Sequence, residues 1–262
     1  MSETLVEVAS EEHVAWLTLN RPDVRNALSA DMCDDLVVAL HGVEADADIR
    51  ALVLRGAGPV FCAGADIAGL SGSDGARFLE SFEAMLEAVA RTRVVTIAAI
   101  HGAALGGGFQ LATVCDFRVA GRTAKLGVPA AKLGILVNFE NVQRLVLLAG
   151  IAAAKEMLLT GSTYSGEEAA PAGLVNAVVD DGRVQEAARH LAGRVSALAP
   201  LSVQGAKRAI QAVIDHLGSA RGTQSATVAE IDRLVTEAYA SEDLAEGLVA
   251  MGEKRPPNFT GR

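Results

Sequence analysis

A nearly continuous apolar segment, Val94–Ile100, is the feature that most constrains the fold of this chain. Its length and composition are typical of a strand buried on both faces, and such strands occur in sheets that helices cover on each side. The glycine-rich stretch Leu105–Gln110 follows shortly after it and begins a predicted helix that continues to about Thr113. The chain therefore contains a buried strand that turns sharply into a helix.

Strand and helix patterns alternate around this segment. The predicted elements are a hairpin of Thr4–Ala9 and His13–Leu19, a helix from Ser29 to Val43, a strand Ala51–Leu54, a helix Asp74–Thr92 and a strand Phe117–Ala120. Such alternation is typical of α/β folds. After Ala199 and Pro200 only helical patterns follow, as far as about Met251. We therefore predict an α/β core over residues 1–198 and a helical region over residues 199–262.

Composition excludes several classes of protein. The formal net charge is −9 and the 23 Lys and Arg residues are scattered, which argues against a nucleic-acid-binding or membrane-binding surface. Cys33, Cys62 and Cys115 form no C-x-x-C pair, so neither a zinc site nor a disulfide framework is indicated. We see no signal peptide and no apolar run long enough to span a bilayer. These features predict a cytoplasmic protein with buried thiols and no bound metal.

The glycine cluster Gly106–Gly108 has the composition of an anion-binding turn. The first N–H groups of a helix lack internal acceptors, and the helix dipole adds partial positive charge there. Glycine lets a ligand approach such a backbone closely, and a site of this kind suits a phosphate or an enolate oxygen. The alternative is a tight turn that needs only backbone freedom. The cluster is not G-x-G-x-x-G, so it does not favour dinucleotide binding.

A second loop, Phe61–Asp66, also follows a predicted buried strand. Gly64 lies between small alanines there, which leaves backbone groups accessible. Each loop alone is explained as a turn. Together they could supply two N–H donors that converge on one oxygen atom.

Two polar residues near these loops have structural interpretations. We expect His101, beside the glycine cluster, to stabilise a turn rather than transfer protons. We expect Asp116 to accept backbone hydrogen bonds where the helix turns into the next strand.

The combination of segments resembles the enoyl-CoA hydratase/isomerase family, the crotonase superfamily. The resemblance follows the family order and covers nearly the whole chain. The matching segments are Asn20–Leu28, Phe61–Asp66, His101–Gly108, Cys115–Asp116, Gln143–Leu145, Gly173–Asn176 and Glu253–Phe259.

The resemblance implies a spiral core of ββα units whose C-terminal helices form trimers that usually pair into hexamers. It implies an acyl-CoA thioester as the ligand and no cofactor beyond that CoA moiety. The implied roles are oxyanion-hole N–H groups at Ala65 and Gly107, backbone contacts to adenine around Ala63, Asp66 and Ile67, and cations near CoA at Arg25 and, from a neighbouring subunit, Lys254. The alternative for Arg25 and Lys254 is that both are simply solvated.

The chain departs from the family where hydratases look to use two glutamates. Gln110 stands at the first position, and Ala130, in Gly127–Ala130, stands at the second. A glutamine amide does not titrate, and each general acid–base group is worth about 10²–10⁴ in rate. We therefore expect ordinary hydratase activity to be weak or absent, while thioester binding is retained.

Glu140 is the one new carboxylate in the loop that follows Ala130. It could replace the lost base in a one-base isomerisation of an enoyl-CoA. We favour the alternative, in which Glu140 caps or charges the start of the next helix. Asn138 stands where some family members place a catalytic aspartate. Two classes of function stay open, a hydratase/isomerase-family enzyme and a non-catalytic acyl-CoA-binding or carrier protein.

Overall fold

The structure is a computed structural model that describes residues 4–67, 72–219 and 224–260. The chain divides into two compact units. The first contains Met1–Leu126 and Tyr164–Val213, and the second contains Gly127–Thr163 and Ile214–Arg262. Helix α7 begins at Pro200, where the sequence changes to helical patterns. The predicted domain boundary at residue 198 stays a prediction.

A six-stranded sheet in the order β1-β2-β3-β4-β6-β9 forms the centre of the first unit. The predicted hairpin is present as β1 and β2, which pair antiparallel, and the remaining neighbours in the sheet are parallel. Its strands are β1 (Val6–Glu11), β2 (Val14–Leu19), β3 (Ala51–Gly56), β4 (Val95–Ile100), β6 (Phe117–Gly121) and β9 (Ala177–Val179). All six residues of β4 are buried, as the apolar segment predicts.

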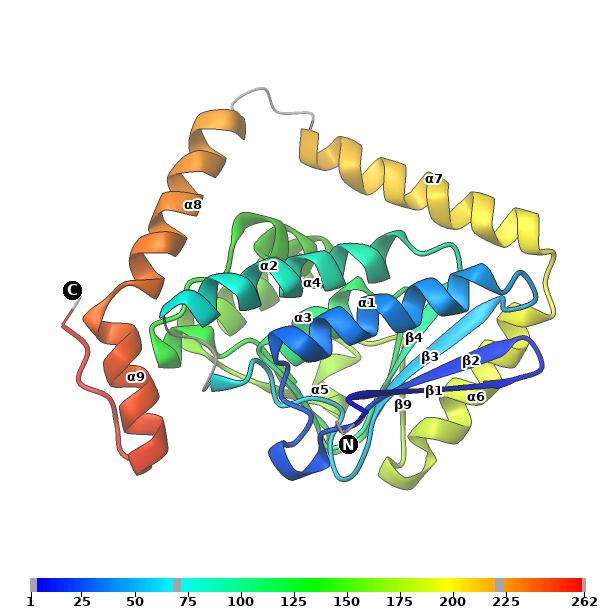
Figure 1. The fold of residues 1–262 in the computed structure, drawn as a ribbon, viewed down its shortest axis with the longest axis horizontal. Helices are drawn as coiled ribbons and strands as arrows, with labels where there is room; N and C mark the ends of the chain where they lie inside the picture. The colour runs from blue at the N-terminus through cyan, green and yellow to red at the C-terminus, as the bar shows by residue number, and fades with distance from the viewer. Residues whose placement is uncertain (1–3, 68–71, 220–223, 261–262) are drawn as a thin grey trace. The chain divides into compact units, whose positions relative to one another are not determined.

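Helices cover both faces of this sheet (Figure 1). On one face, Val184, Ala188 and Ala192 of α6 (Val184–Ser196) pack on alternate residues of four strands, including Trp16 and Val53. Helix α1 (Ala30–Ala45) lies against β1 and β2, and α2 (Gly72–Arg91) packs beside α1. The mixed α/β architecture that the sequence predicts is confirmed.

Local sequence explains where helix α1 begins. The Ser29 hydroxyl accepts a hydrogen bond from the Met32 N–H at 3.2 Å, the predicted N-cap. The buried residues of the helix recur at a helical period, which places one apolar stripe against the sheet. They are Met32, Cys33, Leu36, Leu40 and Val43.

The remaining elements are shorter or lie later in the chain. A three-stranded sheet contains β5 (Ala103–Leu105), β7 (Lys125–Gly127) and β8 (Tyr164–Ser165). The other helices are α3 (Gly107–Val114), the 3-10 helix η3 (Ala130–Leu133), α4 (Phe139–Thr160), α5 (Gly166–Ala169), α7 (Pro200–Ser219), α8 (Gln224–Tyr239) and α9 (Glu242–Glu253). No helix of the described ranges has the length and apolarity that crossing a membrane requires.

Asp116 joins three segments of the first unit. Its carboxylate accepts hydrogen bonds from the Thr96 N–H at 2.7 Å and the Thr96 hydroxyl at 3.0 Å, as expected for a helix-to-strand turn. The same oxygen forms an ion pair of 2.7 Å with Lys207 of α7, whose side chain is only 10% exposed. Lys207 also donates to the Val94 carbonyl at 2.8 Å. This largely enclosed ion pair therefore fixes the end of α3, the start of β4 and α7 together.

Candidate active site

Strand β4 leads through β5 into helix α3, and glycine makes this path possible. Gly106 precedes the helix with a φ of +52°, in the region that favours glycine. A Cβ atom at Gly108 would lie 2.5 Å from the Cys62 carbonyl oxygen, which is far closer than real contacts allow. The glycine cluster is therefore required by the close approach of the loop that contains Cys62.

That loop, Phe61–Asp66, runs alongside β5. The Cys62 N–H donates to the Ala103 carbonyl at 3.0 Å, and the Leu105 N–H donates back to the Cys62 carbonyl at 3.0 Å. Gly64 has a φ of +114°, and a Cβ atom there would lie 2.9 Å from the Leu105 carbonyl oxygen. The two segments that the sequence predicts to converge therefore lie in direct contact.

Two backbone N–H groups at this junction remain unused. The neighbours of Ala65 are bonded, since Leu28 donates to the Gly64 carbonyl and Asp66 donates to the Leu28 carbonyl, each at 2.8 Å. Among the described residues neither the Ala65 N–H nor the Gly107 N–H, in the first turn of α3, has a backbone acceptor. A Cβ atom at Gly107 would lie 3.5 Å from the Ala65 nitrogen. The two donors are therefore close enough to share one ligand oxygen.

An aromatic side chain forms one wall beside these donors. The Phe82 ring of α2 lies against Gly107, because a Cβ atom at Gly107 would be 3.2 Å from its Cε2 atom. Phe82 is buried and stacks with Phe78 at 5.5 Å between ring centres. An apolar wall lowers the local dielectric, which strengthens a hydrogen bond to a developing negative charge.

Asn26 anchors the loop from the other side and was missed as a functional position by sequence reasoning. It is fully buried, and its amide nitrogen lies 2.8 Å, 2.9 Å and 3.2 Å from the carbonyl oxygens of Ala57, Val60 and Phe61. Its own carbonyl oxygen accepts from the Arg21 N–H at 3.0 Å. The sequence placed Asn26 in a family motif, but only these contacts show what it holds.

Comparisons with known proteins identify the family. The family model described as enoyl-CoA hydratase/isomerase matches residues 9–262. A probable enoyl-CoA hydratase of Mycobacterium tuberculosis is 36% identical over 265 residues and covers 100% of both chains.

The chain belongs to the enoyl-CoA hydratase/isomerase family.

Solved structures confirm the crotonase fold. A methylmalonyl-CoA decarboxylase in complex with 2-nitronate-propionyl-CoA superposes with a TM-score of 0.89 at 29% identity, covering 98% of this chain and 99% of the other. Carnitinyl-CoA hydratase from Mycobacterium avium gives a TM-score of 0.84 at 34% identity with 100% of both chains covered. The predicted membership of the crotonase superfamily and its fold are confirmed.

Both positions at which hydratases of the family look to use glutamate lack a carboxylate here. Gln110 lies in α3 of the first unit, half-buried, and its side-chain amide makes no hydrogen bond that the described residues provide. Ala130 is the first residue of η3 in the second unit. Neither side chain can carry a proton.

Glu140 lies in the first turn of α4, and its side chain is exposed. The N-cap of that helix is Asn138, whose side chain accepts from the Asn141 N–H at 3.0 Å. Glu140 therefore occupies the place where an acid stabilises a helix start, which is the interpretation that the sequence favoured.

The residues expected near CoA differ in their exposure and in which of their polar atoms remain available for a contact. The Ala63 and Asp66 N–H groups are already bonded, so a contact with adenine would use their carbonyl oxygens. Asp66 also forms a 2.9 Å ion pair with Arg21, and Ile67 is half-buried. Arg25 is exposed with a φ of 56° in the first unit. Lys254 is exposed at the end of α9 in the second unit.

The buried cysteines are not activated for nucleophilic chemistry, and His101 lies at a turn. Burial raises the pKa of the Cys62 thiol to about 12 and that of the Cys115 thiol to about 12, so both remain neutral near pH 7. The Nε2 atom of His101 donates to the Gly58 carbonyl at 3.0 Å, which confirms its role at a turn. The described part of the chain has no cluster of three His, Cys, Asp or Glu residues able to hold a metal ion.

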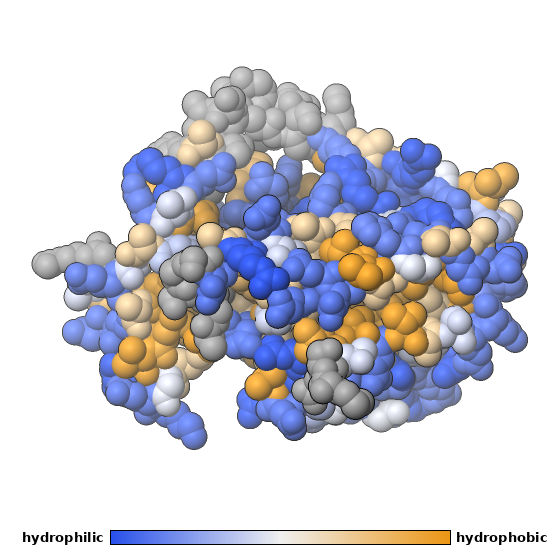
Figure 2. Space-filling view, in the orientation of Figure 1, coloured by the Kyte–Doolittle hydropathy of each residue, from blue (hydrophilic) through white to orange (hydrophobic). Residues whose placement is uncertain are grey.

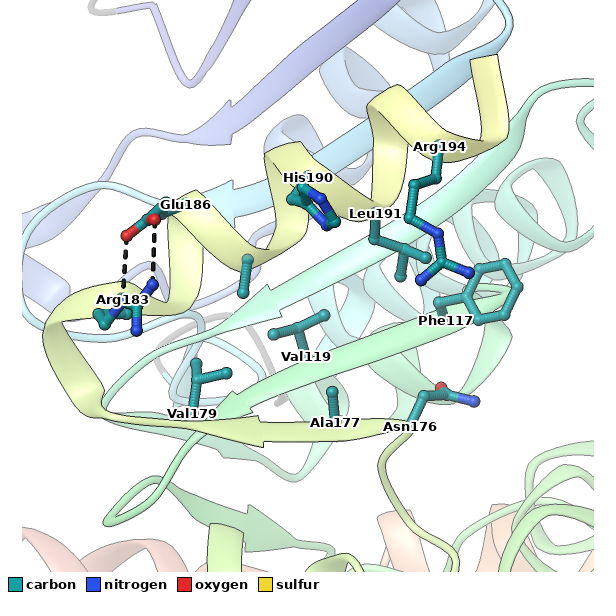
Figure 3. A pocket seen from close by; sticks show the side chains of 11 residues that line it. Phe117, Val119, Asn176, Ala177, Val179, Arg183, Glu186, His190, Leu191 and Arg194 are labelled. Carbon is teal, nitrogen blue, oxygen red and sulfur yellow. Dashed lines mark hydrogen bonds and ion pairs between the residues drawn. The ribbon is translucent and has the colours of Figure 1, made fainter. Parts of the chain in front are cut away.

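A separate hollow of about 560 Å³ lies where α6 leaves strands β6 and β9 uncovered (Figure 3). Its floor is apolar, with Val119, Ala177 and Val179, while Arg183 at its edge is paired with Glu186 at 3.1 Å. It shares no residue with the Ala65 and Gly107 junction. We therefore assign the candidate active site to that junction and not to this hollow.

The Asn26 contacts predict a measurable effect on stability. Asn26→Ala removes the amide that donates to the carbonyl groups of Ala57, Val60 and Phe61, so the free energy of unfolding should fall by about 2–4 kcal/mol. Urea unfolding measures it. Asn20→Ala is the matched control, because the Asn20 side-chain amide donates to the Thr4 carbonyl and the Glu7 carboxylate near the surface, and the substitution should cost about 1 kcal/mol or less. Equal losses for the two variants would contradict the anchoring role.

Proposed function

We propose that the protein binds an acyl-CoA thioester with its carbonyl oxygen between the N–H groups of Ala65 and Gly107. The observation that carries this proposal is the pair of unused donors at the contact of two glycine-dependent loops. Such donors stabilise the enolate that forms when negative charge moves onto the thioester oxygen, and each is worth about 3–4 kcal/mol. By their family positions, Arg25 and the backbone of Ala63, Asp66 and Ile67 are assigned to the CoA moiety. Lys254 is assigned to the CoA that a neighbouring subunit binds.

Ordinary hydration of an enoyl thioester is expected to be weak or absent. Adding water requires one group to activate the water and another to handle the proton at the α-carbon. Gln110 and Ala130 offer neither, and the loss of two acid–base groups costs several orders of magnitude in rate. Binding of the thioester depends on backbone donors and is therefore retained. The function is then either slow turnover of an acyl-CoA or non-catalytic binding and carriage of one.

A matched pair of variants tests the donor at Gly107. Gly107→Pro removes the N–H at the first position of α3, where proline is tolerated, while Gly107→Ala adds a similar Cβ and keeps the N–H. Calorimetry with crotonyl-CoA should show at least about tenfold weaker binding for the proline variant than for the alanine variant. Equal affinities would refute the oxyanion role.

The same protein should hydrate crotonyl-CoA slowly at best, and a rate typical of working hydratases would refute that expectation. Binding of crotonyl-CoA without its hydration would favour the non-catalytic carrier function. If the protein isomerises a 3-enoyl-CoA and Glu140→Ala abolishes that activity, Glu140 acts as the base instead.

Decarboxylation is a second candidate reaction, because it needs the two enolate-stabilising donors but not the proton carriers that Gln110 and Ala130 fail to provide. In a 2-carboxyacyl thioester the bond from the α-carbon to the carboxylate breaks, CO₂ leaves and the electron pair forms the thioester enolate. The enolate then takes a proton from water, so no base is required. Two methylmalonyl-CoA decarboxylase structures superpose with TM-scores of 0.89 and 0.87, which supports this candidate.

Malonyl-CoA and methylmalonyl-CoA test the second candidate directly. We expect release of CO₂ and formation of acetyl-CoA or propionyl-CoA, measured by chromatography of the thioesters. Because the enolate depends on the donor pair, Gly107→Pro should lower this rate by about 10²–10³ relative to Gly107→Ala. Intact substrate after long incubation with protein that binds it would exclude decarboxylation.

Self-association is also part of the proposed function, as a homotrimer or a hexamer. Apolar side chains stand exposed near and on α7, where Ile210 and Val213 lie three residues apart at 63% and 58% exposure. Figure 2 shows such apolar residues among the polar ones that cover the visible face. Light scattering should give three or six times the chain mass of 27.0 kDa. Ile210→Glu should lower that mass, unlike Val38→Glu on α1, and a monomeric wild-type protein would contradict the proposal.

A further inference from the structure

Gln110 carries a side-chain amide that no described residue bonds, one helical turn from the Gly107 N–H. It lies three residues after Gly107 in α3, so the two share one side of the helix at a separation of about one turn. Its side chain is half-buried, and no described residue forms a hydrogen bond with its amide. Polar groups that are held away from bulk water normally find a partner. A ligand bound at the Ala65 and Gly107 junction would be within reach of this amide.

The surroundings of Gln110 favour a negatively charged ligand group. The first turn of α3 contains no acidic residue, and the helix dipole places partial positive charge at that end. The carboxylate of the neighbouring loop, Asp66, is already paired with Arg21 at 2.9 Å. On the remaining side the Phe82 ring offers only an apolar surface against Gly107. The described groups around Gln110 therefore supply N–H donors and positive electrostatic potential. The first turn of α3 contributes no carboxylate.

We propose that Gln110 selects acyl groups that carry a carboxylate on the carbon next to the thioester carbonyl. Its amide N–H₂ donates to that carboxylate while the carbonyl oxygen lies between the N–H groups of Ala65 and Gly107. This inference rests on the proposed thioester site and assigns a residue that selects the 2-carboxyacyl-CoA thioesters over neutral acyl groups. A neutral amide can fill this role, because it donates without bringing a charge that would repel the substrate.

The size of the effect follows from the kind of hydrogen bond. A bond between a neutral donor and a charged acceptor contributes enough to change a dissociation constant by about 10- to 100-fold. Glutamate at the same position would offer only acceptors and a like charge. The proposal therefore predicts that Gln110→Glu changes the affinity for anionic ligands and the affinity for neutral ligands in opposite directions. A purely structural role of Gln110 would not produce this difference.

A pair of stable thioethers measures this selectivity. 2-Carboxypropyl-CoA and propyl-CoA differ in one carboxylate. Because both are thioethers, neither has the thioester carbonyl group that decarboxylation requires. Calorimetry should show tighter binding of the carboxylated ligand by wild-type protein. Gln110→Met, which keeps the length of the side chain, should lower this preference by about 10- to 100-fold, and Gln110→Glu should reverse it.

The control is Gln204→Met, since Gln204 is a half-buried glutamine on α7, and its preference should match that of wild-type protein. Circular dichroism checks that each variant is folded, and Gln110→Ala serves if the methionine variant is not. An unchanged preference in folded Gln110 variants overturns the inference while leaving the thioester site intact. If crotonyl-CoA and both thioethers fail to bind wild-type protein, the proposed function itself is wrong.

Discussion

The contact between loop Phe61–Asp66 and the turn before α3 is the constraint on which the candidate site depends. The two backbones approach so closely that Cβ atoms at Gly64 or Gly108 would collide with carbonyl oxygens. Backbone hydrogen bonds between Cys62 and strand β5 hold the contact, and Asn26 fixes the loop from its far side. The neighbours of Ala65 use their hydrogen bonds in this packing, while the Ala65 N–H beside Gly107 has no backbone acceptor among the described residues.

The sequence predicted the elements of the first unit where local signals were strong. The buried run in β4, the β-branched and apolar residues of β1 and β2 and the Ser29 cap of α1 all depend on residues close together in the chain. The convergence of the two glycine loops was also predicted, because each loop follows a buried strand of one parallel sheet. The contacts that make the site specific were not predictable in this way. Phe82 reads as one member of an apolar helix stripe, and only the fold shows that its ring lies against Gly107.

Asn26 illustrates the same limit for polar residues. An asparagine in a loop is typical of turns, and its φ of 56° fits that expectation. Its partners lie more than thirty residues away in sequence, so no local pattern identifies them. The hollow between α6 and strands β6 and β9 has a similar origin, because α6 does not extend over β9, the last strand of the sheet. That arrangement is a property of packing and not of sequence periodicity.

In the proposed site, an amide at Gln110 in place of a carboxylate has opposite consequences for two kinds of reaction. For hydration it removes a proton carrier, a loss of about 10²–10⁴ in rate. For a substrate that brings its own carboxylate it removes a repulsion, because two unit charges 4 Å apart repel by about 4 kcal/mol at an effective dielectric constant of 20. The resulting enolate is also an anion, so the benefit extends from the bound substrate to the charged intermediate. The proposed site, with two backbone donors and an uncharged amide, is therefore expected to add water poorly and to hold negative charge well.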